Sequence, residues 1–100
     1  MMKPFIIDST TGQLLLVFSK EQLDTIKLSP SRFCDEMEKR GMYGVIGFET
    51  LLIFENENGN ITPKTLVQVH FKKCKDYSSA DIEDIMSCYK AVINEHYKKI

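Results

Sequence analysis

The dipeptide Asn58-Gly59 constrains the fold of this chain more than any other feature of its sequence. A type I′ hairpin turn requires positive φ angles at both central residues, and asparagine and glycine adopt these angles at the lowest cost. Apolar residues alternate on both sides of the dipeptide, in the stretch 43–73. The turn sets a register that pairs Phe54 with Pro63, Leu52 with Thr65, Thr50 with Val67, Phe48 with Val69 and Ile46 with Phe71. One face of this hairpin is therefore continuously apolar.

The opposite face of the predicted hairpin is apolar near the turn and polar further away. In the same register it pairs Ile53 with Lys64, Leu51 with Leu66, Glu49 with Gln68, Gly47 with His70 and Val45 with Lys72. An apolar cluster with a polar rim is typical of a protein interface. We therefore predict a partner-binding surface formed by Leu51, Ile53, Leu66, Glu49, Gln68, His70 and Lys72. The alternative is that a helix at 30–40 covers the apolar cluster and leaves the polar part in water.

A second hairpin is predicted near the N-terminus, from the segments 5–8 and 13–18 with Gly12 between them. Glycine supplies the unusual dihedral angles of a tight turn. The segment 14–18 is apolar on both faces, which indicates a central strand that is covered on two sides. The strand 63–73 is predicted at an edge of the sheet, because Pro63 lacks the N–H group that a second neighbouring strand would need.

Capping residues indicate two helices between the hairpins. Ser19 and Gln22 form a capping-box pattern for a short helix of about two turns. Ser29 followed by Pro30 starts a second helix, and Gly41 marks its end. The residues of this second helix that are expected to face inward are Phe33 and Met37, with Cys34 as a further candidate.

A third helix is predicted from residues 78–81 to the end of the chain. Acidic residues lie in its first turn and Lys98 and Lys99 lie at its other end, as the helix dipole favours. A helix of about 20 residues is about 30 Å long, which is enough to cross a four-stranded sheet. Its predicted packing face consists of Ile82, Ile85, Met86, Tyr89, Val92, Ile93, His96, Tyr97 and Ile100.

The order of these elements predicts an α+β fold in a single domain of residues 1–100. The fold consists of a four-stranded, mainly antiparallel sheet made of two hairpins, with short helices between them (β-β-α-α-β-β-α). The long C-terminal helix is expected to pack on the sheet face that carries Ile46, Phe48, Leu52 and Phe54.

Composition excludes several classes of protein. A net charge of −1 argues against a polyanionic partner, and no apolar run approaches the roughly 20 residues of a membrane span. We do not expect the first residues to form a signal peptide, because Asp8 interrupts the apolar run. Three cysteines without a Cys-x-x-Cys motif suit a reducing compartment. We therefore expect a cytoplasmic protein without a membrane partner.

The residue types that bind metals or carry out catalysis are present, but their spacing is unfavourable. The potential zinc ligands are His70, Cys74, Cys88 and His96. Residues four apart on a strand are separated by about 13 Å, and residues eight apart on a helix by about 12 Å, so neither pair can hold one ion. No histidine is placed by the sequence to activate a cysteine nucleophile. We therefore expect no metal, no cofactor and no catalytic site, and we predict that the chain is not an enzyme.

The leading functional prediction is a small protein-binding module of the inhibitor or immunity-protein type, which acts through the mixed face of the main hairpin. The first alternative is a regulatory or structural homodimer that uses the same face. The second is a small nucleic-acid-binding module that uses the basic run 70–75. This run is short and contains a single aromatic residue, whereas nucleic-acid surfaces carry more positive charge and more exposed rings.

Overall fold

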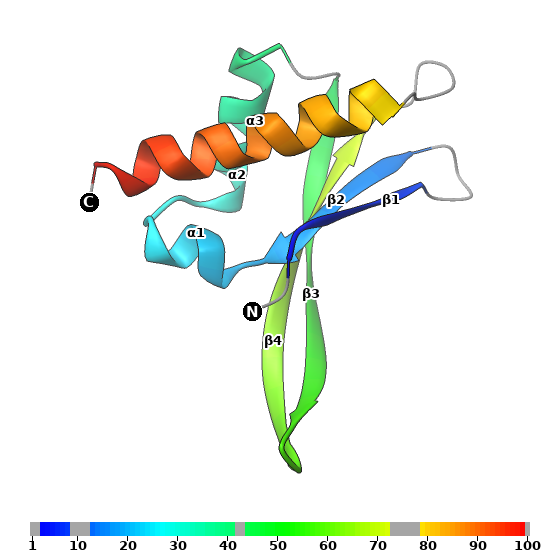
Figure 1. Ribbon diagram of the computed structural model, residues 1–100, viewed down its shortest axis with the longest axis vertical. Coiled ribbons are helices and arrows are strands. Elements are labelled where there is room, and N and C mark those ends of the chain that lie inside the picture. The colour runs from blue at the N-terminus through cyan, green and yellow to red at the C-terminus, as the bar shows by residue number, and fades with distance from the viewer. Residues whose placement is uncertain (1–2, 9–12, 42–43, 73–78, 100) are drawn as a thin grey trace.

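The computed structural model describes residues 3–8, 13–41, 44–72 and 79–99, which form four strands and three helices (Figure 1). In chain order these are β1 (Phe5–Asp8), β2 (Leu14–Ser19), α1 (Glu21–Thr25), α2 (Pro30–Lys39), β3 (Val45–Glu57), β4 (Asn60–Phe71) and α3 (Ser79–Tyr97). The predicted α+β class and the order of the elements are confirmed. The predicted Gly12 turn and Ser78 lie outside the described residues.

The predicted turn of the main hairpin is confirmed, because Asn58 and Gly59 both have positive φ angles, of 51° and 84°. β3 and β4 are antiparallel and keep the predicted register from the turn to the pair of Gly47 with His70. Sequence alternation and turn chemistry therefore specify the same strand pairing over most of the hairpin.

The register changes at the far end of the hairpin. A β-bulge between Val45 and Gly47 places Val45 opposite Phe71, where the sequence predicted Ile46. A bulge sets two residues of one strand against one of its neighbour, so the alternation of faces is interrupted at that point. Val45 consequently packs against the core, whereas Ile46 is 57% exposed.

The four strands form one antiparallel sheet in the order β1-β2-β4-β3. The central position predicted for the 14–18 strand is confirmed, since β2 pairs with both β1 and β4. The edge position predicted for the 63–73 strand is wrong, because β4 is central and β3 is the edge strand. The reason is that β2 pairs with β4 only from Leu66 to Phe71, so Pro63 lies beyond the end of β2 and disturbs no pairing.

The boundaries of α2 follow its capping residues. The Ser29 hydroxyl accepts a hydrogen bond from the backbone N–H of Arg32 at 3.2 Å, and Pro30 is the first helical residue. Gly41, with a φ angle of 78°, lies just past the helix end, as predicted. The capping box predicted from Ser19 and Gln22 is wrong, because the N-cap of the shorter α1 is Lys20; the Ser19 hydroxyl instead accepts from the N–H of Glu21 at 3.3 Å. These bonds satisfy N–H groups that a helix start would otherwise leave without partners.

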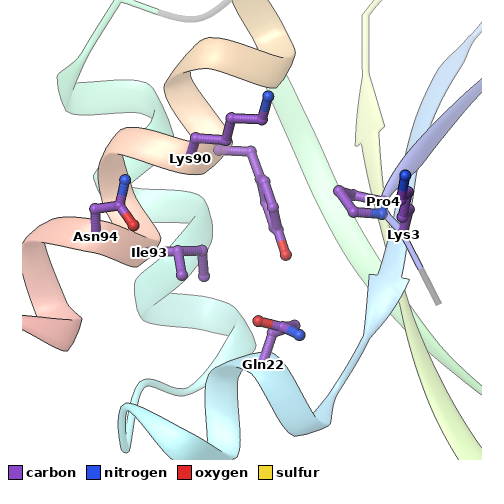
Figure 2. Close-up of a pocket in the computed structure, with 7 residues that line it drawn as sticks. Lys3, Pro4, Gln22, Lys90, Ile93 and Asn94 are labelled. Carbon is purple, nitrogen blue, oxygen red and sulfur yellow. The ribbon is translucent and has the colours of Figure 1, made fainter. Parts of the chain in front are cut away.

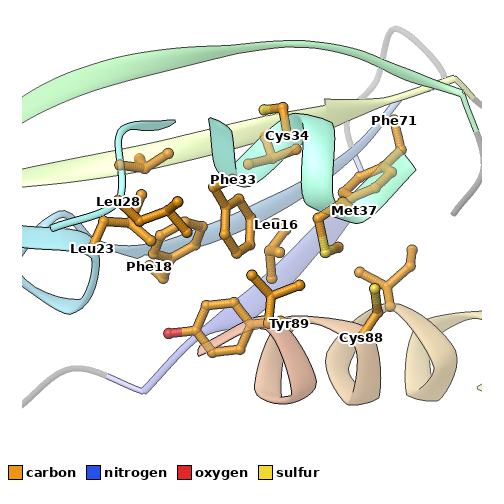
Figure 3. Packing of buried hydrophobic residues seen from close by; sticks show 14 of the residues in the cluster. Leu16, Phe18, Leu23, Leu28, Phe33, Cys34, Met37, Phe71, Cys88 and Tyr89 are labelled. Atoms are coloured by element: carbon orange, nitrogen blue, oxygen red, sulfur yellow. The ribbon is translucent and has the colours of Figure 1, made fainter. Parts of the chain in front are cut away.

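All three helices lie on one side of the sheet, where they enclose the hydrophobic core (Figures 1 and 3). Three aromatic rings meet at its centre: the ring of Phe18 lies 5.0 Å from those of Phe33 and Tyr89, measured between centroids. The predicted inward orientation of Phe33, Cys34 and Met37 is confirmed. The sheet contributes to this core Leu14, Leu16 and Phe18 from β2 and Val67, Val69 and Phe71 from β4.

The C-terminal helix packs on the sheet as predicted, but on other residues than those expected. It buries Ile85, Cys88, Tyr89 and Val92 against the core, which β2 and β4 line. The β3 residues that were predicted to lie beneath it are exposed, namely Ile46 (57%), Phe48 (39%), Leu52 (57%) and Phe54 (66%). On the helix itself, Ile82 and Tyr97 are also exposed, and Ile100 lies outside the described residues.

The distal part of the main hairpin explains this difference. Beyond the last pair of β2 with β4, Ser19 with Leu66, the two long strands continue alone and extend away from the helices (Figure 1). We call residues 51–65 the arm. Its two strands pair with each other, and at its base the Thr65 carbonyl accepts a hydrogen bond from the N–H of Lys20 at 2.9 Å. None of the described helices covers either face of the arm.

Candidate functional site

The side chains of the predicted partner-binding surface lie on the face of the sheet that is opposite to the helices. Side chains alternate along a strand, so the neighbours of the core residues Val67 and Val69 point to this open face. The structure brings together on it Glu49, Leu51 and Ile53 from β3 and Leu66, Gln68 and His70 from β4. Lys72 is exposed and lies just past the end of β4.

The structure decides whether α2 covers the apolar part of this surface. The buried residues of α2 contact the core on the helix side, so α2 does not cover Leu51. Leu51 is 45% exposed, Ile53 is half-buried, and Leu66 is buried between its neighbours. The alternative prediction of a covering helix at 30–40 is therefore wrong.

The open face carries apolar residues on β1 and β2 that the sequence-based site did not include. Phe5 and Ile7 are each 41% exposed and lie opposite Val17 and Leu15. The sequence contained a signal for this apolar surface, because the 14–18 segment is apolar on both faces. The helices cover one face, so the other face had to contact something else.

The polar part of the open face is centred on His70. Its Nδ1 atom lies 3.0 Å from Oε1 of Gln13, and its Nε2 atom lies 3.7 Å from Oε1 of Glu49. A hollow of about 290 Å³ adjoins these groups and is also lined by Ile46, Gly47 and Phe48. His70 is thus hydrogen-bonded through Nδ1 to the Gln13 amide, whereas its Nε2 atom is buried and has no hydrogen-bond partner among the described residues. None of the residues that line the hollow is a cysteine, serine or lysine nucleophile.

One cation lies between two carboxylates near the tip of the arm. The Nζ atom of Lys64 lies 2.8 Å from a carboxylate oxygen of Glu55 and 3.4 Å from one of Glu57. Hydrogen bonding within this group lowers the pKa of Glu55 and raises the pKa of Lys64. Two carboxylates and one ammonium group leave a net charge of −1 on this group, beside the apolar residues of the arm.

The helix-side face of the arm is apolar and exposed as well. Leu52 and Phe54 on β3 are 57% and 66% exposed, and Ile61 on β4 is 72% exposed. Sequence reasoning assigned Leu52 and Phe54 to the core because their alternation matches that of buried strand residues. The arm thus exposes large apolar side chains on both of its faces.

A separate apolar cavity of about 390 Å³ lies between α3, α1 and the residues that precede β1 (Figure 2). It is lined by Lys3, Pro4, Gln22, Tyr89, Lys90, Ile93 and Asn94. Burial raises the pKa of the Tyr89 phenol to about 12, so its hydroxyl group stays protonated at neutral pH. The volume is within the range of small-molecule sites, but its charged groups, Lys3 and Lys90, are exposed and do not converge on a common point (Figure 2).

The cysteines that the structure describes are unsuited to nucleophilic chemistry. Burial, together with the nearby Asp35 and Glu38 carboxylates, raises the pKa of the Cys34 thiol to about 11. Burial also raises the pKa of Cys88. Both thiols are protonated at neutral pH, whereas the thiolate is the reactive form. Cys74 lies outside the described residues.

The potential metal ligands are not brought together. His70 lies on the open face of the sheet, whereas Cys88 and His96 lie on α3, on the other side. Among the described residues, no three His, Cys, Asp or Glu side chains form a group that could hold a metal ion. The Nε2 atom of His96 lies 3.8 Å from a carboxylate oxygen of Glu36 on α2 and has no hydrogen-bond partner among the described residues. Within the same part of the chain, no helix has the length and apolar character needed to cross a membrane.

Comparison with known proteins gives no match from which a function could be inferred. No family model matches the chain, and no curated protein and no solved structure matches it.

Proposed function

We propose that the chain is a protein-binding module whose contact surface is the arm together with the adjoining open face of the sheet. The observation that carries this proposal is the exposure of Leu51, Leu52, Phe54 and Ile61 on the two faces of one projecting hairpin. A two-stranded hairpin alone is marginally stable in water, so a partner that covers these side chains would also stabilise the arm.

The surroundings of the apolar residues support a contact with protein. Near the tip, Lys64 forms ion pairs with two carboxylates, and near the base His70 and Gln68 form a polar border. An apolar centre with a polar rim is the usual composition of a protein interface. A more specific inhibitor or immunity-protein role, and a cytoplasmic location, remain predictions.

The nucleic-acid alternative has less support from the arrangement of charges. Only residues 70–72 of the basic run 70–75 are described, and His70 is hydrogen-bonded to Gln13 and lies 3.7 Å from a carboxylate oxygen of Glu49. Phe71 is fully buried, so its ring is not available for stacking on a base.

Site-specific photo-crosslinking tests the proposed function. A benzophenone amino acid at position 51 should give a protein adduct in cells that express the chain, because this position lies at the base of the arm. The same amino acid in place of Glu83, an exposed residue of α3, should give none. Association through apolar contacts should also persist when salt is raised and nuclease is added.

Two results would overturn the proposal. One is an equal yield of adducts, or no adduct, at positions 51 and 83. The other is an adduct at position 51 that disappears with nuclease, with salt and in the Lys72→Glu variant, since this pattern identifies a nucleic-acid contact.

A further inference from the structure

We infer that the partner is a second copy of this chain, and that the two β3 strands pair in antiparallel orientation around Leu51. The two four-stranded sheets would then form one continuous sheet, with the two-fold axis at Leu51. This inference rests on the proposed function, since it names the partner of the same surface.

The first step is that β3 is a long edge strand with unsatisfied backbone groups. It has 13 residues and pairs only with β4. The two-residue turn closes on a hydrogen-bonded pair, and the pairs alternate from there. The backbone N–H and C=O groups of Thr50, Leu52 and Phe54 therefore point outward, away from β4. An edge of this kind accepts a further strand unless something blocks it.

The second step is that the opposite edge of the arm is blocked. Beyond Leu66, β4 pairs with no further strand on its outer side, but the Thr65 carbonyl there already accepts a hydrogen bond from the backbone N–H of Lys20 at 2.9 Å. Pro63 lies opposite Phe54 in a non-hydrogen-bonded pair, so its nitrogen points toward this outer side and has no hydrogen to donate. β3 contains neither proline nor lysine, the residues that commonly protect an edge. The β3 edge is thus the open one.

The third step is that β3 is complementary to itself. Leu51 is the middle residue of Val45–Glu57, so a two-fold axis there pairs the regular segment from Gly47 to Glu55 with its copy, short of the bulge between Val45 and Gly47. In this register Leu51 lies opposite Leu51 of the second copy. Each residue whose backbone N–H and C=O groups point away from β4 lies opposite another such residue, as antiparallel hydrogen bonding requires. The further pairs are Phe48 with Phe54, Glu49 with Ile53, Thr50 with Leu52 and Gly47 with Glu55 of the second copy.

Charge favours the register with its axis at Leu51 over the register with its axis at Leu52, one residue closer to the turn. An axis at Leu52 would place Glu49 opposite Glu55 of the second copy, and like charges directly opposite are destabilising. The axis at Leu51 places no two acidic residues opposite each other. It also joins the apolar residues of both faces, with Phe48 beside Phe54 on the helix side and Leu51 beside Leu51 on the open side.

The positions of the three helices leave the outer edge of the arm accessible. Figure 1 shows the helices beyond the base of the arm, with α2 and α3 over the opposite end of the sheet. The described part of the chain places no element beside the outer edge of β3 along the arm. A second strand can therefore approach from the side.

Disulfide trapping with purified protein tests both the partner and the register. In a non-hydrogen-bonded antiparallel pair the Cα atoms lie about 4.5 Å apart, which a disulfide can span. In a Cys74→Ser background, where Cys34 and Cys88 are buried, Leu51→Cys should form a disulfide dimer in a glutathione buffer. Glu49→Cys and Ile53→Cys should each form little dimer alone, but a mixture of the two should form the mixed disulfide. Glu83→Cys provides the exposed control.

Sedimentation of the unmodified chain completes the test by measuring its mass in solution. We expect a dimer whose fraction rises with protein concentration. The inference is overturned if Leu51→Cys forms no more dimer than Glu83→Cys, or if mixed and unmixed pairs of the 49 and 53 variants crosslink equally. If the purified chain stays monomeric while position 51 photo-crosslinks to a different protein, this inference fails and the proposed function stands. If position 51 yields no adduct at all, both fail.

Discussion

Replacing Phe33 with alanine should lower the free energy of unfolding by about 3–5 kcal/mol, because the ring is fully buried between two other aromatic rings. Its removal leaves a cavity next to Phe18 and Tyr89 that the surrounding helices and strands cannot fill completely. Urea denaturation measures the loss, with the slope of the transition expected to stay unchanged.

Phe54 provides the matched control for this prediction. Its ring is 66% exposed on the arm, so Phe54→Ala should change the free energy of unfolding by no more than about 0.5 kcal/mol. The comparison requires protein concentrations at which the chain is monomeric, since association stabilises the folded state. Equal losses in the two variants would mean that a helix covers the arm, contrary to the structure.

Replacing Leu51 with aspartate should weaken association by at least about 2 kcal/mol, which is roughly 30-fold in the dissociation constant. In the dimer the substitution would place two carboxylates opposite each other at the two-fold axis and remove them from water. Folding should be little affected, because Leu51 is 45% exposed in the single chain. Sedimentation measures association, and circular dichroism at low concentration checks the fold.

A charge-swap experiment makes this prediction specific to a two-fold contact. Leu51→Lys should fail to associate for the same reason as Leu51→Asp, whereas a mixture of the two variants should form a heterodimer. Ile82→Asp is the control, because Ile82 is 38% exposed on α3 and away from the arm. Full association of Leu51→Asp alone would show that the apolar residues at the base of the arm are not the contact.

The sequence was sufficient to predict the main hairpin because two local signals agreed. The positive φ angles that Asn58 and Gly59 tolerate select the turn, and the alternation of apolar residues confirms the register. The same reasoning assigned Leu51, Ile53 and Leu66 to one face, since faces depend only on whether a residue number is odd or even along a regular strand. The bulge near Val45 was not predictable from these signals.

What covers each face depends on distant elements, and local patterns do not contain that information. Leu52 and Phe54 alternate in the same way whether a helix, a second chain or water lies above them. Their assignment to the core was therefore wrong. The edge position predicted for the 63–73 strand was also wrong, because Pro63 prevents pairing only in its own short stretch and not along the whole strand. The length of β2 decides both outcomes, because β2 ends before it reaches the arm.

Amide hydrogen exchange along β3, resolved for single residues, tests most directly whether another strand completes this edge. The N–H groups of Leu51 and Ile53 point toward β4 and should be protected at every protein concentration. The N–H groups of Thr50, Leu52 and Phe54 point outward and should exchange fast in dilute protein, then become protected as the concentration rises and the second β3 strand pairs with them. Fast exchange at these three residues at every concentration, beside protected Leu51 and Ile53, would contradict the pairing of β3 with a second copy.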